Sequence, residues 1–328
     1  MSGAGVHDTA RSTFVTVRDG LRLHVREYGA RTAAGLPVVC LPGLARTVAD
    51  FATLAPFLAR TAAAEHGGAA AHPQSGTDPV AVRRVIAVDS RGRGRSDYDR
   101  NPDNYNLVVE LADLRTVLTT LDVGAAVFVG SSRGGLLVMQ LAVVQPTAIA
   151  GVVLHDIGPV IEQNGLARIK SYVGKLPQPR DFADGAEILR RLFGPQFPKF
   201  TDGQWLTAAS RTWQMHEGAL KPTYDVGLSK LLAAVDTEQP LPPLWNEFDA
   251  LARVPMLVIH GANSDILSAE TLAAMAARHP GMQTIEIPHQ GHVPALEGED
   301  LLQHVAAFVA ECDHAFQRAS GLAKRNSD

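Results

Sequence analysis

The sequence predicts an α/β fold in which helices flank a mostly parallel central sheet. Short apolar runs alternate with amphipathic helical patterns up to residue 158 and again from residue 246, an arrangement typical of parallel sheets. Between them, residues 159–245 show only helical patterns, punctuated by Pro and Gly. We therefore expect one core domain, formed by residues 1–158 and 246–328, with a helical lid at 159–245 inserted after the sixth strand.

The elements of the core follow in order along the chain. Residues 13–29 alternate apolar and polar side chains on both sides of Asp19-Gly20, a dipeptide that favours a hairpin turn. Further strands are expected at 37–43, 82–90, 125–130, 149–158, 254–265 and 282–288, and helices at 47–60, 107–121, 133–146, 268–279 and 299–316. Residues 62–79 are rich in Ala, Gly, His and Pro without periodicity, so we interpret them as an exposed loop insertion.

Composition excludes several classes of protein. Of the 328 residues, 46% are apolar and the net charge is −4 without a basic block, so neither nucleic acid nor a membrane surface is expected as a partner. No apolar run reaches about 18 residues and the N-terminus lacks the features of a signal peptide, so we expect a cytoplasmic protein. The two cysteines, Cys40 and Cys312, read as buried free thiols, and no metal-ligand spacing or cofactor motif occurs.

A candidate nucleophile lies where the strand at 125–130 meets the helix at 133–146. The stretch VGSSRGG (129–135) fits a GxSxG pattern in one register, Gly130-Ser131-Ser132-Arg133-Gly134, which selects Ser132. In a strand–turn–helix context this pattern places a strained serine at the edge of a parallel sheet, and the glycines avoid clashes where strand and helix pass closely.

A serine nucleophile needs a base, and that base needs an orienting acid. The loop after the last strand, PHQGHVPALEG (288–298), contains His289 and His292; we prefer His292 and expect His289 at the surface. For the acid, the loop after the preceding strand presents Asp265, and the order Ser132, Asp265, His292 is the one expected for this kind of triad. Asp156, at the end of the strand at 149–158, is the rival acid.

Five motifs together resemble the α/β-hydrolase family on its lid-bearing serine-hydrolase side. They are LPGL (41–44), DSRGRGRSDYD (89–99), GSSRG (130–134), GANSDIL (261–267) and QGHVP (290–294). The resemblance implies an oxyanion hole formed by the backbone N–H groups of Leu44 and Arg133. It also implies that DSRGRGRSDYD is a structural loop. The Arg133 side chain is expected to form an ion pair, for example with Asp50 or Asp97, or alternatively to reach the site and favour an acidic substrate.

These observations predict a serine hydrolase that cleaves carboxylic esters through an acyl-enzyme on Ser132. The expected substrate is a small molecule with a short to medium acyl or aryl group, with lactones and polyesters also open, and the protein is expected as a monomer or homodimer. Aromatic residues of the predicted lid could form the pocket: Tyr172, Phe193, Phe197, Phe200, Trp205, Trp213 and Tyr224. One alternative is a carbon–carbon bond hydrolase of aromatic degradation, although such enzymes have a glycine-rich oxyanion loop and this chain has LPGLART at that place. The other alternative is a non-catalytic receptor on the same fold.

Overall fold

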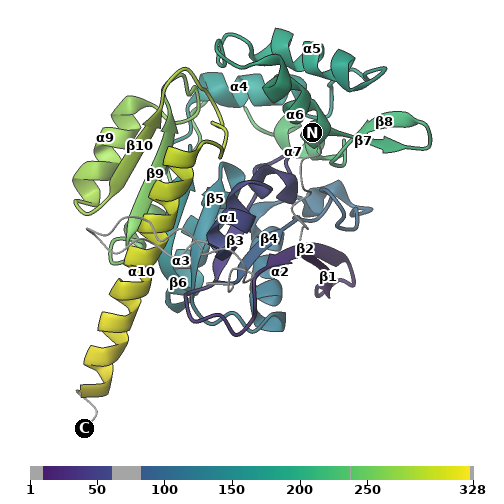
Figure 1. Cartoon of the computed structure of the whole chain (residues 1–328). Coiled ribbons are helices and arrows are strands. Elements are labelled where there is room, and N and C mark those ends of the chain that lie inside the picture. The colour runs from purple at the N-terminus through teal and green to yellow at the C-terminus, as the bar shows by residue number, and fades with distance from the viewer. Residues whose placement is uncertain (1–9, 61–82, 237, 326–328) are drawn as a thin grey trace, which may run out of the picture.

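An eight-stranded sheet runs through the centre of the molecule in the computed structural model (Figure 1), which describes residues 10–60, 83–236 and 238–325. The predicted insertion at 62–79 lies outside the described residues. The strand order is β1-β2-β4-β3-β5-β6-β9-β10. Their bounds are β1 (Arg11–Thr16), β2 (Arg22–Tyr28), β3 (Val38–Leu41), β4 (Val85–Val88), β5 (Ala126–Ser131), β6 (Ile149–His155), β9 (Met256–Gly261) and β10 (Gln283–Ile287).

The sheet is mostly parallel, as the alternation of apolar runs and helical patterns predicts. Only the pairs β1–β2 and β2–β4 are antiparallel. The β1–β2 hairpin turns at Asp19-Gly20, where Gly20 has a φ of +90°. Strands β3, β4, β5, β6 and β9 are buried along their whole length, which explains their continuous apolar sequences.

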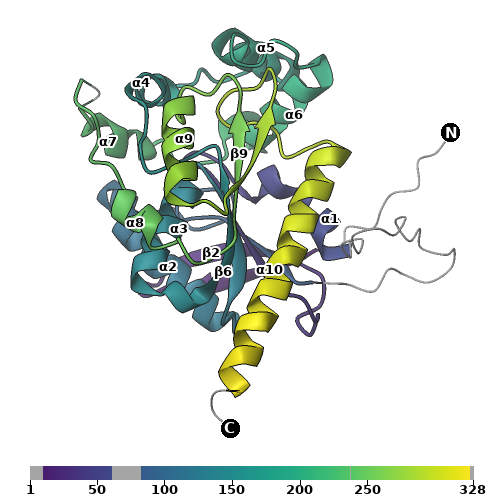
Figure 2. The same ribbon diagram turned by 90° about the vertical axis from the view of Figure 1, so that its left-hand side faces the viewer.

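Helices cover both faces of the sheet. Helices α1 (Leu54–Arg60) and α10 (Glu299–Arg325) pack on one face, where Cys40 and Cys312 are buried. Helices α2 (Leu107–Thr120), α3 (Arg133–Val144), α8 (Trp245–Asp249) and α9 (Ala269–Arg278) pack on the other. Figure 2 shows these two layers on opposite sides of the sheet and the far end of α10 projecting beyond it. No helix among the described residues is both long enough and apolar enough to cross a membrane.

Between β6 and β9 the chain builds a separate layer above the carboxyl ends of the strands (Figure 1). Its elements are α4 (Gln163–Tyr172), α5 (Phe182–Phe193), α6 (Asp202–Thr212), β7 (Trp213–His216), β8 (Ala219–Pro222) and α7 (Leu228–Ala233). It has its own apolar cluster, in which Trp205, Trp213 and Leu220 are buried. We call residues 159–245 the cap segment.

The cap segment is not purely helical, contrary to the sequence-based expectation. Helix α6 ends at Thr212, and β7 and β8 form an antiparallel hairpin. Glu217 and Gly218, with φ of 50° and 79°, form its two-residue turn, and two positive φ angles are what a tight hairpin turn requires. Trp213 begins β7 and is buried in the cap cluster, so the helical pattern expected for this region ends one residue before it.

Candidate active site

Ser132 lies at the sharp turn between β5 and α3, with a φ of 48° and a ψ of −114°. Such a backbone conformation is strained for a residue with a side chain and survives only where its surroundings impose it. The two glycines of the motif impose it here. A Cβ on Gly130 would lie 2.6 Å from the Gly135 backbone, and one on Gly134 would lie 2.1 Å from the Leu41 carbonyl oxygen. Strand β5, helix α3 and the end of β3 therefore pack backbone to backbone around Ser132.

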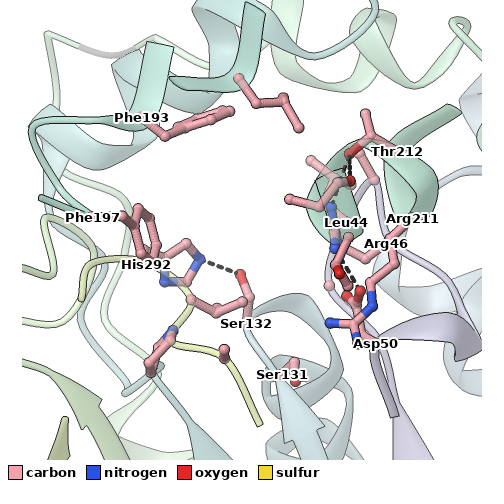
Figure 3. A pocket seen from close by; sticks show the side chains of 18 of the residues that line it. Leu44, Arg46, Asp50, Ser131, Ser132, Phe193, Phe197, Arg211, Thr212 and His292 are labelled. Atoms are coloured by element: carbon pink, nitrogen blue, oxygen red, sulfur yellow. Dashed lines mark hydrogen bonds and ion pairs between the residues drawn. The ribbon is translucent and has the colours of Figure 1, made fainter. Parts of the chain in front are cut away.

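The loop after β10 brings His292 to Ser132. Nε2 of His292 lies 2.8 Å from Oγ of Ser132 (Figure 3), and Nδ1 lies 2.8 Å from Oδ2 of Asp156. Because an ionised carboxylate only accepts hydrogen bonds, Nδ1 carries a proton and Nε2 is left to accept one from the serine. The arrangement is that of a nucleophile, a base and an orienting acid.

Asp156 is completely buried and firmly held. Its Oδ1 accepts the N–H of Gly261 at 2.8 Å, and its Oδ2 accepts the Ser264 hydroxyl at 2.7 Å besides His292. Three donors to one carboxylate fix its orientation. Asp156 is therefore equipped to hold the His292 ring in one tautomer and orientation.

The structure corrects the prediction that Asp265 is the acid. Both Asp265 carboxylate oxygens accept hydrogen bonds from Arg168 of α4, at 2.5 and 2.7 Å. Burial acts to raise the pKa of Asp265, but the Arg168 guanidinium outweighs it and lowers that pKa. Close packing fixes this pairing, because a Cβ on Gly165 of α4 would lie 2.2 Å from the Asp265 carbonyl oxygen. Asp265 thus ties the core to the cap segment.

The pairing of β6 with β5 and the ion pair of Asp265 with Arg168 together account for the correction. Strand β6 pairs directly with β5, with His155 opposite Ser131, whereas β9 lies one strand further away. The residue after β6, Asp156, therefore lies at the same sheet edge as Ser132 and contacts His292, while the Asp265 carboxylate is bound to Arg168. The candidate His289 is exposed, as expected.

A second buried pair, Ser131 and His155, lies beside the nucleophile, and the sequence gives no sign that these two residues contact each other. Ser131 Oγ lies 2.6 Å from Nδ1 of His155, whose Nε2 lies 2.8 Å from the Pro294 carbonyl oxygen. The carbonyl can only accept, so Nε2 donates to it and Nδ1 accepts the Ser131 hydroxyl proton. Burial is the main cause that lowers the pKa of His155 to about 4. A neutral His155 therefore connects the elbow to the loop that carries His292.

The backbone N–H groups of Arg133 and Leu44, which the resemblance implied as oxyanion donors, both belong to segments that adjoin Ser132. Arg133 begins α3, so its N–H belongs to the first turn, where a helix provides no internal acceptor. Leu44 follows β3, and a Cβ on Gly43 would lie 3.6 Å from the Cβ of Ser132. The Gly43 carbonyl accepts the Arg46 N–H at 3.3 Å. Because carbonyl and N–H point in opposite directions across a trans peptide, the Leu44 N–H is directed away from that turn.

The Arg133 side chain makes a structural ion pair, but not with the partners suggested from the sequence. Its Nε donates to Glu110 Oε2 at 2.7 Å, while Asp50 pairs with Arg46 and Asp97 with Arg22. The loop DSRGRGRSDYD is structural, as expected. Within it, Arg91 and Arg93 are each 1% exposed and are paired with Asp113 and Glu110.

A cavity of about 190 Å³ opens beside Ser132 and His292. In Figure 3, Phe193 and Phe197 lie on the His292 side, and Leu44, Arg46 and Asp50 lie across from them. The aromatic residues that line it are Tyr172, Phe193, Phe197, Phe200, Trp205 and Tyr224. Trp213 packs inside the cap cluster instead. The charged side chains that line the cavity form ion pairs, Arg46 with Asp50 and Arg211 with Glu297. The described part of the chain contains no cluster of His, Cys, Asp or Glu suited to a metal ion.

Comparisons with known proteins agree with the fold described above. Residues 37–299 match the family described as alpha/beta hydrolase fold. A 3-hydroxybutyrate-oligomer hydrolase from Cupriavidus necator is 29% identical over 78% of this chain and 82% of its own length. An esterase from Mycobacterium tuberculosis is 25% identical over 63% of this chain and 68% of its own.

The crystal structure of an alpha/beta hydrolase from Novosphingobium aromaticivorans is also similar. It is 34% identical, superimposes with a TM-score of 0.79, and the match covers 92% of this chain and 98% of that one. The family match spans both strands and loops that hold Ser132 and His292. The chain is therefore a member of the α/β-hydrolase fold family and a hydrolase.

Proposed function

We propose that the protein is a serine hydrolase that cleaves carboxylic esters through an acyl-enzyme on Ser132. The observation that carries the proposal is the continuous chain of contacts from Ser132 Oγ through His292 to the buried Asp156, each 2.8 Å long. A serine at its free pKa is a poor nucleophile, and this arrangement supplies both the base and its orienting acid.

In the proposed reaction, Ser132 Oγ attacks the ester carbonyl carbon while His292 Nε2 accepts its proton. Asp156 stabilises the resulting imidazolium. The N–H groups of Leu44 and Arg133 donate to the oxyanion, and each such donor typically contributes about 3 kcal/mol of barrier lowering. The tetrahedral adduct collapses, the C–O bond breaks, and the alcohol leaves with the proton from His292. A water molecule, deprotonated by His292, then attacks the acyl-enzyme and releases the carboxylic acid and free Ser132.

The size and lining of the cavity favour esters with short to medium acyl or aryl groups as substrates. Its volume of about 190 Å³ is small, and all of the Phe, Tyr and Trp residues that line it, including Phe193 and Phe197, belong to the cap segment. We propose that residues 159–245 act as a lid that covers the bound ester. Two relatives are an esterase and a 3-hydroxybutyrate-oligomer hydrolase, which favours short hydroxyacid oligoesters as substrates to test beside simple esters.

Hydrolysis rates across an ester series test the proposal. The panel contains p-nitrophenyl acetate, butyrate, octanoate and palmitate, a lactone, a dimer of 3-hydroxybutyrate and a vinylogous diketone for carbon–carbon cleavage. We expect the highest kcat/KM on acetate to octanoate, and at least about a 10³-fold loss of kcat in Ser132→Ala. The matched control Ser210→Ala, on an exposed position of α6, should retain activity. Cleavage of the diketone alone, or unchanged activity in Ser132→Ala, contradicts the proposal.

A further inference from the structure

Glu110 of α2 connects the two chain segments that carry the proposed oxyanion donors. Its Oε2 accepts Arg133 Nε at 2.7 Å, and its Oε1 accepts Arg93 Nη1 at 2.7 Å. Arg93 Nε in turn donates to the Leu44 carbonyl oxygen at 2.7 Å. The side chains thus form an unbroken path from the start of α3 to the loop after β3.

This path is buried and charged. The Glu110 and Arg93 side chains are each 1% exposed, and that of Arg133 is 11% exposed. Burial acts to raise the pKa of Glu110, but the two guanidiniums outweigh it and lower that pKa, so the carboxyl stays ionised. Charged hydrogen bonds in such surroundings are short, directional and resistant to water.

The same helix carries a second buried carboxylate that makes a useful contrast. Asp113, one turn after Glu110, accepts Nε and Nη2 of Arg91 at 2.7 Å each. Arg91 belongs to the same turn as Arg93 but donates its side-chain hydrogen bonds to Asp113, Asp19 and Asp99. The Asp113–Arg91 pair therefore fixes the loop to α2 without contacting Leu44 or Arg133.

We propose that Glu110 is a positioning residue for the oxyanion hole. It sets the spacing between the Leu44 and Arg133 backbones through Arg93 and the Arg133 side chain. The inference rests on the proposed function, because it concerns the oxyanion of ester hydrolysis.

The geometry of an oxyanion hole explains why such a residue matters. Both donors have to lie about 2.7–3.1 Å from the position of the developing oxyanion, which the ground-state carbonyl does not fully occupy. A shift of about 1 Å in a positioning group can cost about 10²-fold in rate. Loosening the link should therefore weaken binding of the transition state more than binding of the substrate.

The test compares Glu110→Gln and Arg93→Lys with the matched control Asp113→Asn. For each variant we would measure kcat and KM on p-nitrophenyl butyrate, the Ki of butylboronic acid and the Tm. The boronic acid adds to a serine and places an oxygen in the oxyanion hole. We expect kcat to fall about 10- to 100-fold in Glu110→Gln and Arg93→Lys, with KM within about twofold and Ki rising in parallel. Asp113→Asn should lower Tm by a comparable amount with kcat within about threefold.

The outcomes separate the two levels of the proposal. If Ser132→Ala abolishes hydrolysis but Glu110→Gln and Asp113→Asn lower kcat equally, or the boronate Ki does not change, the positioning role is wrong and the proposed function stands. If Ser132→Ala leaves hydrolysis intact, the proposed function itself fails. Arg93→Lys keeps the charge beside Glu110, so it decides the question should Glu110→Gln fail to fold.

Discussion

The Asp156 carboxylate lies 2.8 Å from Nδ1 of His292 and has no exposed surface. The same carboxylate accepts the Gly261 N–H and the Ser264 hydroxyl, both from the segment at the end of β9. Asp156 therefore holds two things at once, the orientation of the histidine ring and the neighbouring loop. An imidazole held in this way stays in the tautomer protonated at Nδ1, so its Nε2, 2.8 Å from Ser132 Oγ, is free to accept the serine proton.

This relationship predicts that Asp156→Asn lowers kcat by about 10³- to 10⁴-fold, because an asparagine amide can stabilise the wrong tautomer of His292 and not its charged form. Asp265→Asn should lower kcat by less than about tenfold, since Asp265 binds Arg168 rather than His292. Steady-state kinetics on p-nitrophenyl butyrate measures both. A larger decrease of kcat in Asp265→Asn than in Asp156→Asn would show that Asp265, and not Asp156, is the acid.

The close packing around the elbow predicts a severe effect of Gly134→Ala. The added Cβ would lie 2.1 Å from the Leu41 carbonyl oxygen, a backbone atom that cannot move aside cheaply. We expect destabilisation above about 4 kcal/mol or no folded protein. The matched control is Gly124→Ala, where a Cβ meets nothing within 4 Å, with an expected effect within about 0.5 kcal/mol. Urea unfolding compares the two, and equal stability would show that strand and helix are not in contact here.

The buried His155 predicts a specific loss of stability as the pH falls. Its folded pKa, lowered mainly by burial, is about 4, whereas the unfolded value is about 6.5. Between these values the unfolded chain binds a proton that the folded protein does not, so stability decreases as the pH falls from about 6.5 to about 4, by roughly 2–4 kcal/mol from this group. His155→Gln removes the contribution, so its stability should vary less with pH over that window.

Urea unfolding of the parent protein and His155→Gln at pH 7, 6, 5 and 4.5 checks this expectation. The difference between the two proteins isolates His155 from the other histidines. If both proteins lose stability in parallel, then His155 is not kept neutral by the fold.

Much of the fold and two of the three residues of the proposed triad could be predicted because their signals are local. The hairpin at Asp19-Gly20 and the elbow glycines are encoded in adjacent residues, as is the strand–helix alternation. Ser132 and His292 each come after a strand that can be recognised from the apolar residues of the strand itself. Residues that depend only on their immediate neighbours in the chain are the ones that sequence patterns place correctly.

The choice of Asp156 over Asp265 as the acid and the partner of Arg133 could not be predicted in the same way, because each depends on contacts between distant segments. Asp156 contacts His292, which lies 136 residues further along the chain, and no local pattern reveals this contact. In the sequence, Glu110 looks like an ordinary carboxylate on a helix. In the structure it is buried beside Arg93, which belongs to a different loop, and no local pattern indicates that contact. The β7–β8 hairpin did leave a local signal, Glu217-Gly218, but the helical periodicity before it concealed where α6 ends.

The most direct test of the account is covalent labelling of the nucleophile. The protein is treated with a fluorophosphonate, digested and mapped by mass spectrometry, alongside Ser132→Ala and His292→Gln. We expect stoichiometric modification of Ser132, no modification in Ser132→Ala, and labelling slowed by at least about 10²-fold in His292→Gln, because the histidine no longer accepts the serine proton. An unlabelled parent protein, or a label on Ser131, would contradict the assignment of Ser132 as the nucleophile.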